Sequence, residues 1–288
     1  MKLVAGSISD GPVLALLEGF LQHDIMKDMA RWRPTTGTPQ GAAISPLLAN
    51  IYLHYALDLW AARWRRRQAT GDMIIVRYAD DIVVGFEKEA EARRFWDAMR
   101  ARLREFSLSL HPEKTRLIEF GRFAAVTRTQ CGLGKPETFS FLGFTLICGK
   151  TRQGQFQLKR KTRPDRMRAK LQEIKDELRW RMHQPIPEQG RWLKQVVTGF
   201  FAYHAVPTNG AALSAFRYHV TCLWRRSLRR RSQKDASTWQ RVGKLADDWL
   251  PKPKILHPWP HQRFAVKYPR WEPYAGVPHV RICAGDAR

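Results

Sequence analysis

The sequence predicts an α+β protein in which an antiparallel sheet with helices precedes an all-helical bundle and an extended C-terminal tail. Two β-branched apolar runs, at 73–76 and 82–86, flank a short polar break, which is typical of two buried strands joined by a tight turn. Apolar residues recur at helical spacing between 164 and 250. The tail, 251–288, is rich in Pro, His, Trp and Arg, and we expect it to wrap the bundle or to order on a partner.

These patterns divide the chain into three expected domains, with boundaries near 149 and 250. In the first domain we expect a strand hairpin at 72–87, and the second contains only helices. The expected further strands of the first domain are 115–120 and 139–147, its helices are 12–30, 46–67 and 89–106, and a loop is expected at 121–138. The expected helices of the second domain are 164–183, 190–205, 211–231 and 238–249.

The charge of the chain is strongly asymmetric. Its 50 Lys and Arg against 26 Asp and Glu give a formal net charge of +24. Residues 1–150 contain 21 basic and 16 acidic residues, a net of +5, whereas residues 151–288 contain 29 and 10, a net of +19. Such an excess indicates a polyanionic partner. Eleven Trp interleaved with Arg favour nucleic acid over a membrane.

Several classes of site are not expected. The four cysteines, Cys131, Cys148, Cys222 and Cys283, form no Cys-x-x-Cys pair, so we expect neither zinc nor a disulfide framework, and idle thiols fit a reducing cytoplasm. No apolar run approaches the roughly 18–20 residues that span a bilayer, and no signal peptide is recognisable.

Asp80 and Asp81 lie in the polar break between the two predicted strands. Adjacent carboxylates in a partly buried setting repel each other unless a cation compensates them. Mg²⁺ prefers such oxygen ligands and usually takes only one or two protein carboxylates. The pair therefore indicates a metal site for phosphoryl or nucleotidyl transfer. The alternative is an ordinary turn between strands, because Asp is a common turn residue.

Three further blocks accompany Tyr78-Ala79-Asp80-Asp81. They are Pro39-Gln40-Gly41 with Ser45–Asn50, Leu110–Thr115, and Phe141-Leu142-Gly143-Phe144. In this order and spacing, the four blocks resemble the reverse transcriptases encoded by bacterial group II introns. The segments 198–203 and 224–232 look like the maturase-type thumb of that family.

The resemblance implies a fold and an activity. Residues 1–149 would form a partial polymerase palm and residues 150–250 the thumb, or maturase domain. The activity would be that of an RNA-directed DNA polymerase, a nucleotidyltransferase, acting with Mg²⁺ on dNTPs, an RNA template and a DNA primer. The protein would also bind its group II intron RNA and assist its splicing, as part of a mobile element in the bacterial cytoplasm.

The resemblance also assigns roles to individual residues. Asp80 and Asp81 would be the catalytic metal ligands, and Gly143 would lie in the primer-gripping region. For Gly143 the alternative is a simple bulge, which a Gly within a strand also marks. The residues expected near nucleotide or template are Gln40, Gly41, Tyr78 and Lys114. For Lys114, a surface ion pair with Glu113 or Glu119 is the alternative. Basic residues expected to contact nucleic acid, with phosphate as the target, are Lys159, Arg160, Lys161, Arg225, Arg226, Arg229, Arg230 and Arg231.

One departure from the family bears on catalysis. The family carries its first metal-binding Asp on a strand well upstream of the Pro-Gln-Gly block. Here the residues before Pro39 predict a loop and a helix, and Asp10 lies in a turn signature. We therefore expect the chain to be truncated at its N-terminus, with doubtful polymerase activity on its own. The alternatives are a non-catalytic RNA-binding maturase fragment and a remnant of a broken intron gene.

Overall fold

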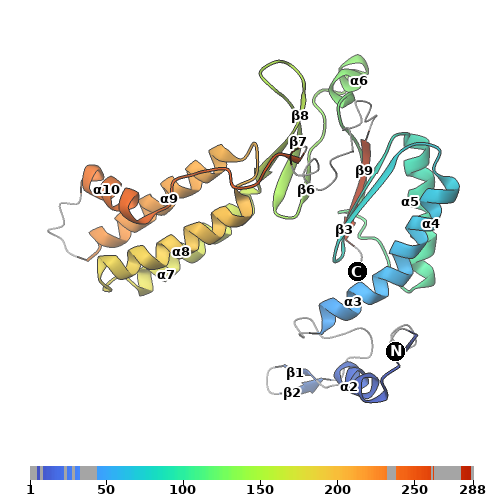
Figure 1. Cartoon of the computed structure of the whole chain (residues 1–288), viewed down its shortest axis with the longest axis horizontal. Coiled ribbons are helices and arrows are strands. Elements are labelled where there is room, and N and C mark those ends of the chain that lie inside the picture. The colour runs from blue at the N-terminus through green and yellow to red at the C-terminus, as the bar shows by residue number, and fades with distance from the viewer. Residues whose placement is uncertain are drawn as a thin grey trace. The chain divides into compact units, whose positions relative to one another are not determined.

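The computed structural model describes residues 5–6, 9–22, 25–27, 30–32, 44–231, 238–260, 262 and 280–286 (Figure 1). It separates into two compact units. Unit 1 comprises 1–119 with 278–288, and unit 2 comprises 120–277. This division does not test the expected domain boundaries near 149 and 250, which stay predictions. Gln40 and Gly41 lie outside the described residues.

Unit 1 is a mixed helix and sheet structure, as predicted. Its helices are α2 (Gly11–Gln22), α3 (Ser45–Leu53), the π-helical segment η1 (His54–Asp58), α4 (Leu59–Gln68) and α5 (Glu89–Glu105). Its strands are β1 (Ile25–Lys27), β2 (Ala30–Trp32), β3 (Met73–Tyr78), β4 (Asp81–Phe86), β5 (Arg116–Phe120) and β9 (Val280–Asp286). The expected first helix is too long, because it ends at Gln22 and the antiparallel pair β1–β2 follows.

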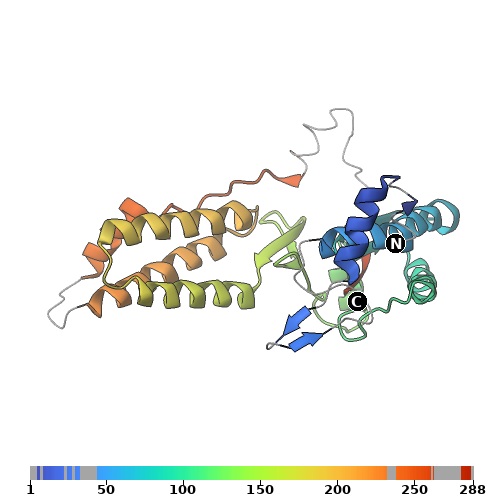
Figure 2. The ribbon, with the colours of Figure 1, turned by 90° about the horizontal axis from the view of Figure 1, so that it is seen from below.

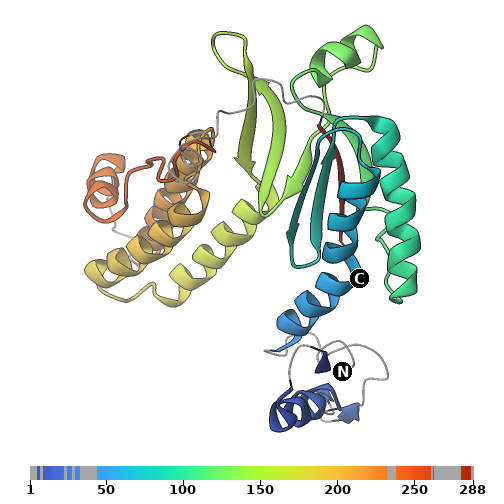
Figure 3. The same ribbon diagram turned by 45° about the vertical axis from the view of Figure 1, so that its right-hand side comes forward.

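The main sheet of unit 1 has the strand order β3-β4-β9-β5 (Figure 3). β4 pairs antiparallel with β3 on one side and with β9 on the other. The tail therefore differs from the expectation of extended chain alone, since its last described segment adds a strand to this sheet. The alternation Val280, Ile282, Ala284 is the strand pattern in that segment.

One face of this sheet is covered by helices. Met73, Val84 and Phe86 from β3 and β4 pack in one core with Leu57 from the π-helical segment and Phe95 from α5. Five further side chains complete the buried part of this core, namely Ala61, Ile82, Ala92, Met99 and Leu103. Phe86, Phe95 and Trp64 contact one another through edge-on and tilted rings. The other face of β3 is open, with Ile74, Val76 and Tyr78 exposed.

The first half of unit 2 contains a three-stranded sheet of order β6-β7-β8, preceded by a short helix. Its elements are α6 (Ala124–Gln130), β6 (Phe139–Phe141), β7 (Phe144–Lys150) and β8 (Phe156–Thr162). Two sequence expectations are wrong here. The expected loop at 121–138 contains α6, and the expected single strand at 139–147 is the hairpin β6–β7, with Leu142 and Gly143 as its two-residue turn.

Four helices complete unit 2, close to the predicted ranges. They are α7 (Pro164–Trp180), α8 (Ile186–His204), α9 (Gly210–Arg229) and α10 (Trp239–Trp249), and Figure 2 shows α7, α8 and α9 running alongside one another. They share one apolar core with Leu193, Phe216 and Trp224 fully buried. The Trp224 indole N–H donates to Oε1 of buried Gln189 at 2.9 Å, which satisfies both polar groups in that core.

The beginning of the tail lies against this bundle. The amides of Leu256 and His257 donate to the carbonyl of Ala205, at 3.0 and 3.1 Å. The His257 ring contacts the Ala202 carbonyl at 2.7 Å. This part of the tail therefore lies against the C-terminal end of α8. Among the described residues, no helix combines the length and apolar character needed to cross a membrane.

Candidate active site at the β3–β4 turn

The turn between β3 and β4 carries the Asp pair. Tyr78 and Asp81 are the last register partners of the two strands, so Ala79 and Asp80 form a two-residue turn. Ala79 has φ 53°, in the left-handed region that favours Gly. A side chain in that region costs about 1–2 kcal/mol, which the surrounding structure must offset. Asp80 is exposed at the tip and Asp81 is half-buried.

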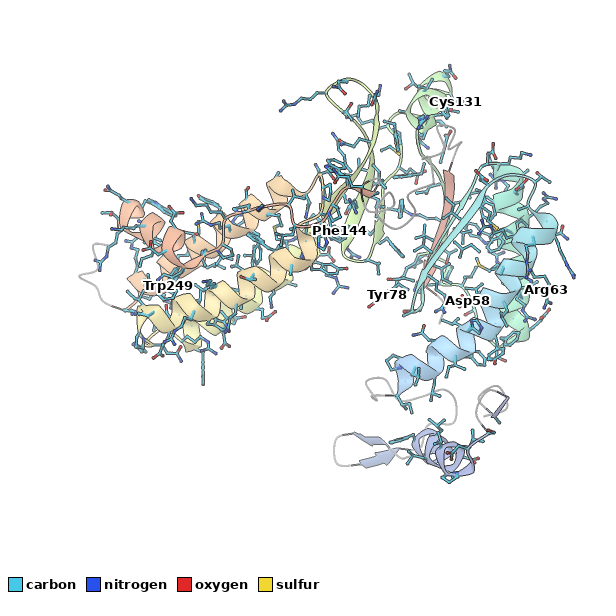
Figure 4. The ribbon with its side chains drawn as sticks, viewed as in Figure 1. Asp58, Arg63, Tyr78, Cys131, Phe144 and Trp249 are labelled. Carbon is cyan, nitrogen blue, oxygen red and sulfur yellow. The ribbon has the colours of Figure 1, made fainter. Side chains whose placement is uncertain are left out.

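Arg77 holds this turn from the helical side of the sheet. Its guanidinium donates to the Ala79 carbonyl at 2.9 Å, across the turn. The same group donates to both carboxylate oxygens of Asp58, at 2.8 and 2.7 Å, and to Oδ1 of Asn50 at 2.8 Å. Figure 4 labels Asp58 on the neighbouring helix and Tyr78 at the end of β3. The turn is therefore tied to the helix that packs behind the sheet.

The electrostatics of this contact favour the charged pair. The hydrogen bond with Asp58 raises the pKa of Arg77, and this effect exceeds the opposing effect of burial. Asp58 ends the π-helical segment, in which the Leu59 amide donates to the His54 carbonyl. π-helical turns of this kind occur frequently at functional sites.

Alternation along the strands places Arg77 and Asp81 on opposite faces of the sheet. Residues paired directly across two antiparallel strands share a face, so Asp81 shares the open face with Tyr78, and Arg77 shares the covered face with Ile82. Tyr78 is 65% exposed on that open face. On the open face, the half-buried Asp81 carboxylate therefore lies beside the exposed Tyr78 ring. Arg77 lies on the covered face of the same sheet.

The C-terminal strand brings a third Asp position to this edge. Asp286 is the register partner of Asp81 across the β4–β9 pairing. Two adjacent Asp residues are a sufficient protein contribution for Mg²⁺, which completes its octahedron with water and substrate phosphates. Within the part of the chain that the structure describes, no group of three or more His, Cys, Asp or Glu side chains is placed to hold a metal.

The other predicted site residues occupy different places. Lys114 is exposed in the turn two residues before β5 of unit 1. Gly143 lies in the β6–β7 turn of unit 2, with φ 75°. The preceding Leu142 has φ 47°, and the two positive values match the type I′ turn of tight hairpins. The Leu142 carbonyl accepts a hydrogen bond from the Tyr203 hydroxyl at 2.8 Å.

The predicted basic residues of unit 2 differ in exposure. Lys161 is exposed on β8, whereas Lys159 and Arg160 are half-buried, and burial lowers the pKa of Arg160. Arg226, Arg229 and Arg230 are exposed near the end of α9. Two others have local partners. The Arg225 guanidinium stacks on the Trp239 ring at 4.2 Å, and Arg231 donates to the Gln184 carbonyl.

Comparison with known families bears on the segment that contains the Asp pair. Residues 13–146 match the family model described as reverse transcriptase (RNA-dependent DNA polymerase). The match supports a reverse transcriptase. A search of curated proteins found no match. The matched segment includes the whole β3–β4 hairpin, so the Asp pair lies within the matched region.

Sequence reasoning missed the residues that support the β3–β4 turn. Arg77, Asp58 and Asn50 were assigned no role, although Arg77 interrupts the buried alternation Met73, Ile75 with a charge. A charged residue at a covered strand position requires a partner, which is a signal visible in the sequence. The identity of that partner depends on helix packing across 19 residues of chain and has no local signature.

Proposed function

We propose that this chain is an RNA-directed DNA polymerase of the group II intron type, with Asp80 and Asp81 as its metal-binding carboxylates. The single observation that carries the proposal is the Asp pair at the tip of the β3–β4 hairpin, inside the segment that matches reverse transcriptases. The expected substrates are dNTPs, an RNA template and a DNA primer. The bundle α7–α10 takes the place of the thumb in this proposal.

The roles of the protein groups follow from the open face of the sheet. Bound Mg²⁺ would supply activation of the primer hydroxyl and stabilisation of the leaving pyrophosphate. Asp80 and Asp81 would hold the ion, and the Arg77 contact would keep their turn in place before substrate arrives. Tyr78, exposed beside Asp81, would contact the nucleotide or template, and Asp286 offers a third carboxylate-bearing position.

Primer extension on an RNA template tests this proposal. The purified chain is incubated with Mg²⁺, dNTPs and a DNA primer, beside Asp80→Asn, Asp81→Asn and Asp286→Asn. Asp72→Asn is the matched control, because Asp72 is an exposed carboxylate at the opposite end of the same hairpin. If the proposal holds, wild type and the control extend the primer, and the Asp80 and Asp81 variants lose about 100-fold or more, since each removes a metal ligand.

A second candidate function is RNA binding without polymerisation, as a maturase that helps intron RNA to fold and splice. Its specific support is the net charge of +19 carried by residues 151–288, which contain 29 basic and 10 acidic residues. Binding of intron RNA by the same samples, measured across a salt series, separates the two candidates. No extension together with tight, strongly salt-dependent binding would favour the maturase, whereas extension lost in Asp80→Asn would favour the polymerase.

A further inference from the structure

A groove of about 720 Å³ lies between α7 and α9 within unit 2. Its cationic lining comes from both helices, with Arg168 and Lys175 on α7 and Arg226 on α9. All three side chains belong to exposed residues. No Asp or Glu is among the residues that line the groove. Its charge is therefore uniformly positive, which suits a chain of phosphates.

An aromatic surface adjoins these cations. Tyr218 lines the groove and is 60% exposed. Its ring lies nearly parallel to that of Trp239, at an interplanar angle of 9° and a centroid distance of 6.5 Å. Trp239 is 49% exposed, and the Arg225 guanidinium lies over its ring. Two partly exposed rings thus lie beside the cationic lining of the groove.

We propose that the α7–α9 groove binds an unpaired segment of nucleic acid. Arg168, Lys175 and Arg226 contact its phosphates, and a base stacks on the Tyr218–Trp239 surface. Cationic side chains alone would bind any polyanion. Exposed aromatic rings favour nucleic acid whose bases are unpaired and can stack on them. A duplex hides its base faces, so it gains only the charge component. The proposal deepens the RNA-binding role of the bundle and rests on it for the class of ligand.

The test compares a 12-nucleotide unpaired RNA with the same sequence in a duplex, using the full-length chain and fluorescence anisotropy. Tyr218→Ala removes the stacking ring, and we expect it to weaken binding of unpaired RNA about 10-fold and of duplex less than 2-fold. Tyr218→Phe keeps the ring and loses the hydroxyl that hydrogen-bonds Cys222, so it should bind like wild type. The control Trp180→Ala removes a ring that is 81% exposed on α7 and does not line the groove.

The charges are tested with Arg168→Gln/Lys175→Gln. Loss of two phosphate contacts should reduce the slope of log affinity against log salt by about 1.4 for unpaired RNA. Lys170→Gln on the same helix is the control, because Lys170 pairs with Glu173 at 2.7 Å. The proposal would be overturned if a control variant lost as much RNA affinity as the variant it accompanies. It would also be overturned if Tyr218→Ala weakened binding of duplex and unpaired RNA equally, or if polyglutamate competed as well as unpaired RNA. If the wild-type chain binds no RNA at all, the RNA-binding role itself fails instead.

Discussion

The Arg77 guanidinium donates two hydrogen bonds to the Asp58 carboxylate, of 2.8 and 2.7 Å, and a third to the Ala79 carbonyl. This one side chain connects a helix to the turn that carries Asp80 and Asp81. Planar Arg suits the task, because its fork of donors matches both carboxylate oxygens and leaves a further N–H for the turn. Lys has the same charge but lacks this geometry.

Arg77→Lys should therefore loosen the turn without removing the charge. We expect a destabilisation of about 2 kcal/mol, since charge-assisted hydrogen bonds on a partly buried pair are lost. Hydrogen exchange of the peptide that contains 73–86 should become faster, and the denaturation midpoint should fall. The control Arg93→Lys alters an exposed pair with Glu89 and should change stability by less than about 0.5 kcal/mol. Unchanged exchange in Arg77→Lys would contradict the role assigned to this contact.

The turn between β6 and β7 offers two substitutions with opposite expected signs. Leu142→Gly should stabilise unit 2 by about 1 kcal/mol, because φ 47° strains any side chain. Gly143→Ala should destabilise it by about 1–2 kcal/mol at φ 75°. The nearest atom to a Cβ at Gly143 would be Cε1 of Tyr203 at 3.7 Å, an ordinary contact, so the effect is conformational. Urea unfolding of both variants measures the change in the free energy of unfolding. Changes of the same sign would contradict the turn conformation assigned to Leu142 and Gly143.

The pairing of β9 with β4 predicts a specific cross-link. Val84 and Cys283 are register partners, and directly opposite Cα atoms lie within the range that a disulfide spans. Under mild oxidation, Val84→Cys should form a disulfide with Cys283, identified by peptide mass mapping. Val84→Ser is the control for non-specific oxidation. A cross-link from Val84→Cys to exposed Cys131 in place of Cys283 would contradict the register.

The main elements were predictable where periodicity is strong. The β3–β4 hairpin followed from its apolar runs, and Ala92, Phe95 and Met99 on α5 are buried as their spacing predicts. The adjacent carboxylates likewise marked the candidate site directly. Such features depend on neighbours in the sequence, so local patterns are sufficient to find them.

Other features depend on contacts that the sequence does not encode locally. Within the helix expected over 46–67, the apolar residues Leu47, Tyr52 and Leu59 are 58%, 37% and 45% exposed. A π-helical turn inserts an extra residue at His54–Asp58 and shifts the apolar stripe around the helix. The turn at Leu142 was missed for a related reason, because Leu is an unusual residue at positive φ.

Glu91 predicts a pH dependence for unit 1. The residue is 1% exposed, and burial alone would raise its pKa, but hydrogen bonds from the Thr70 hydroxyl and amide and from Gly71, with the charge of Lys88, lower it overall. Because the pKa of Glu91 is lower in the folded state, ionised Glu91 stabilises that state fully above the ordinary pKa of 4.5. This stabilisation is lost as the pH falls through the folded pKa.

Glu91→Gln should therefore destabilise the chain by about 1–3 kcal/mol at neutral pH and by less in acid. Thermal unfolding between pH 7 and pH 3 measures the difference. Glu105→Gln is a suitable comparison, because Glu105 makes an exposed pair with Arg102 and should show little effect at either pH. A constant difference across the pH range would exclude the ionised Glu91 as the source.

Gly190 and Gly199 on α8 predict opposite outcomes for the same substitution. A Cβ at Gly190 would lie 2.4 Å from Cδ2 of Trp249, whose ring packs against the core of the bundle. Gly190→Ala should therefore force that ring aside and destabilise unit 2 by about 1–3 kcal/mol. Gly199 has nothing within 4 Å of its Cβ position, so Gly199→Ala should stabilise the helix by about 0.5–1 kcal/mol. Urea unfolding followed by Trp fluorescence distinguishes them, and stabilisation by Gly190→Ala would show that α8 and α10 do not pack this closely.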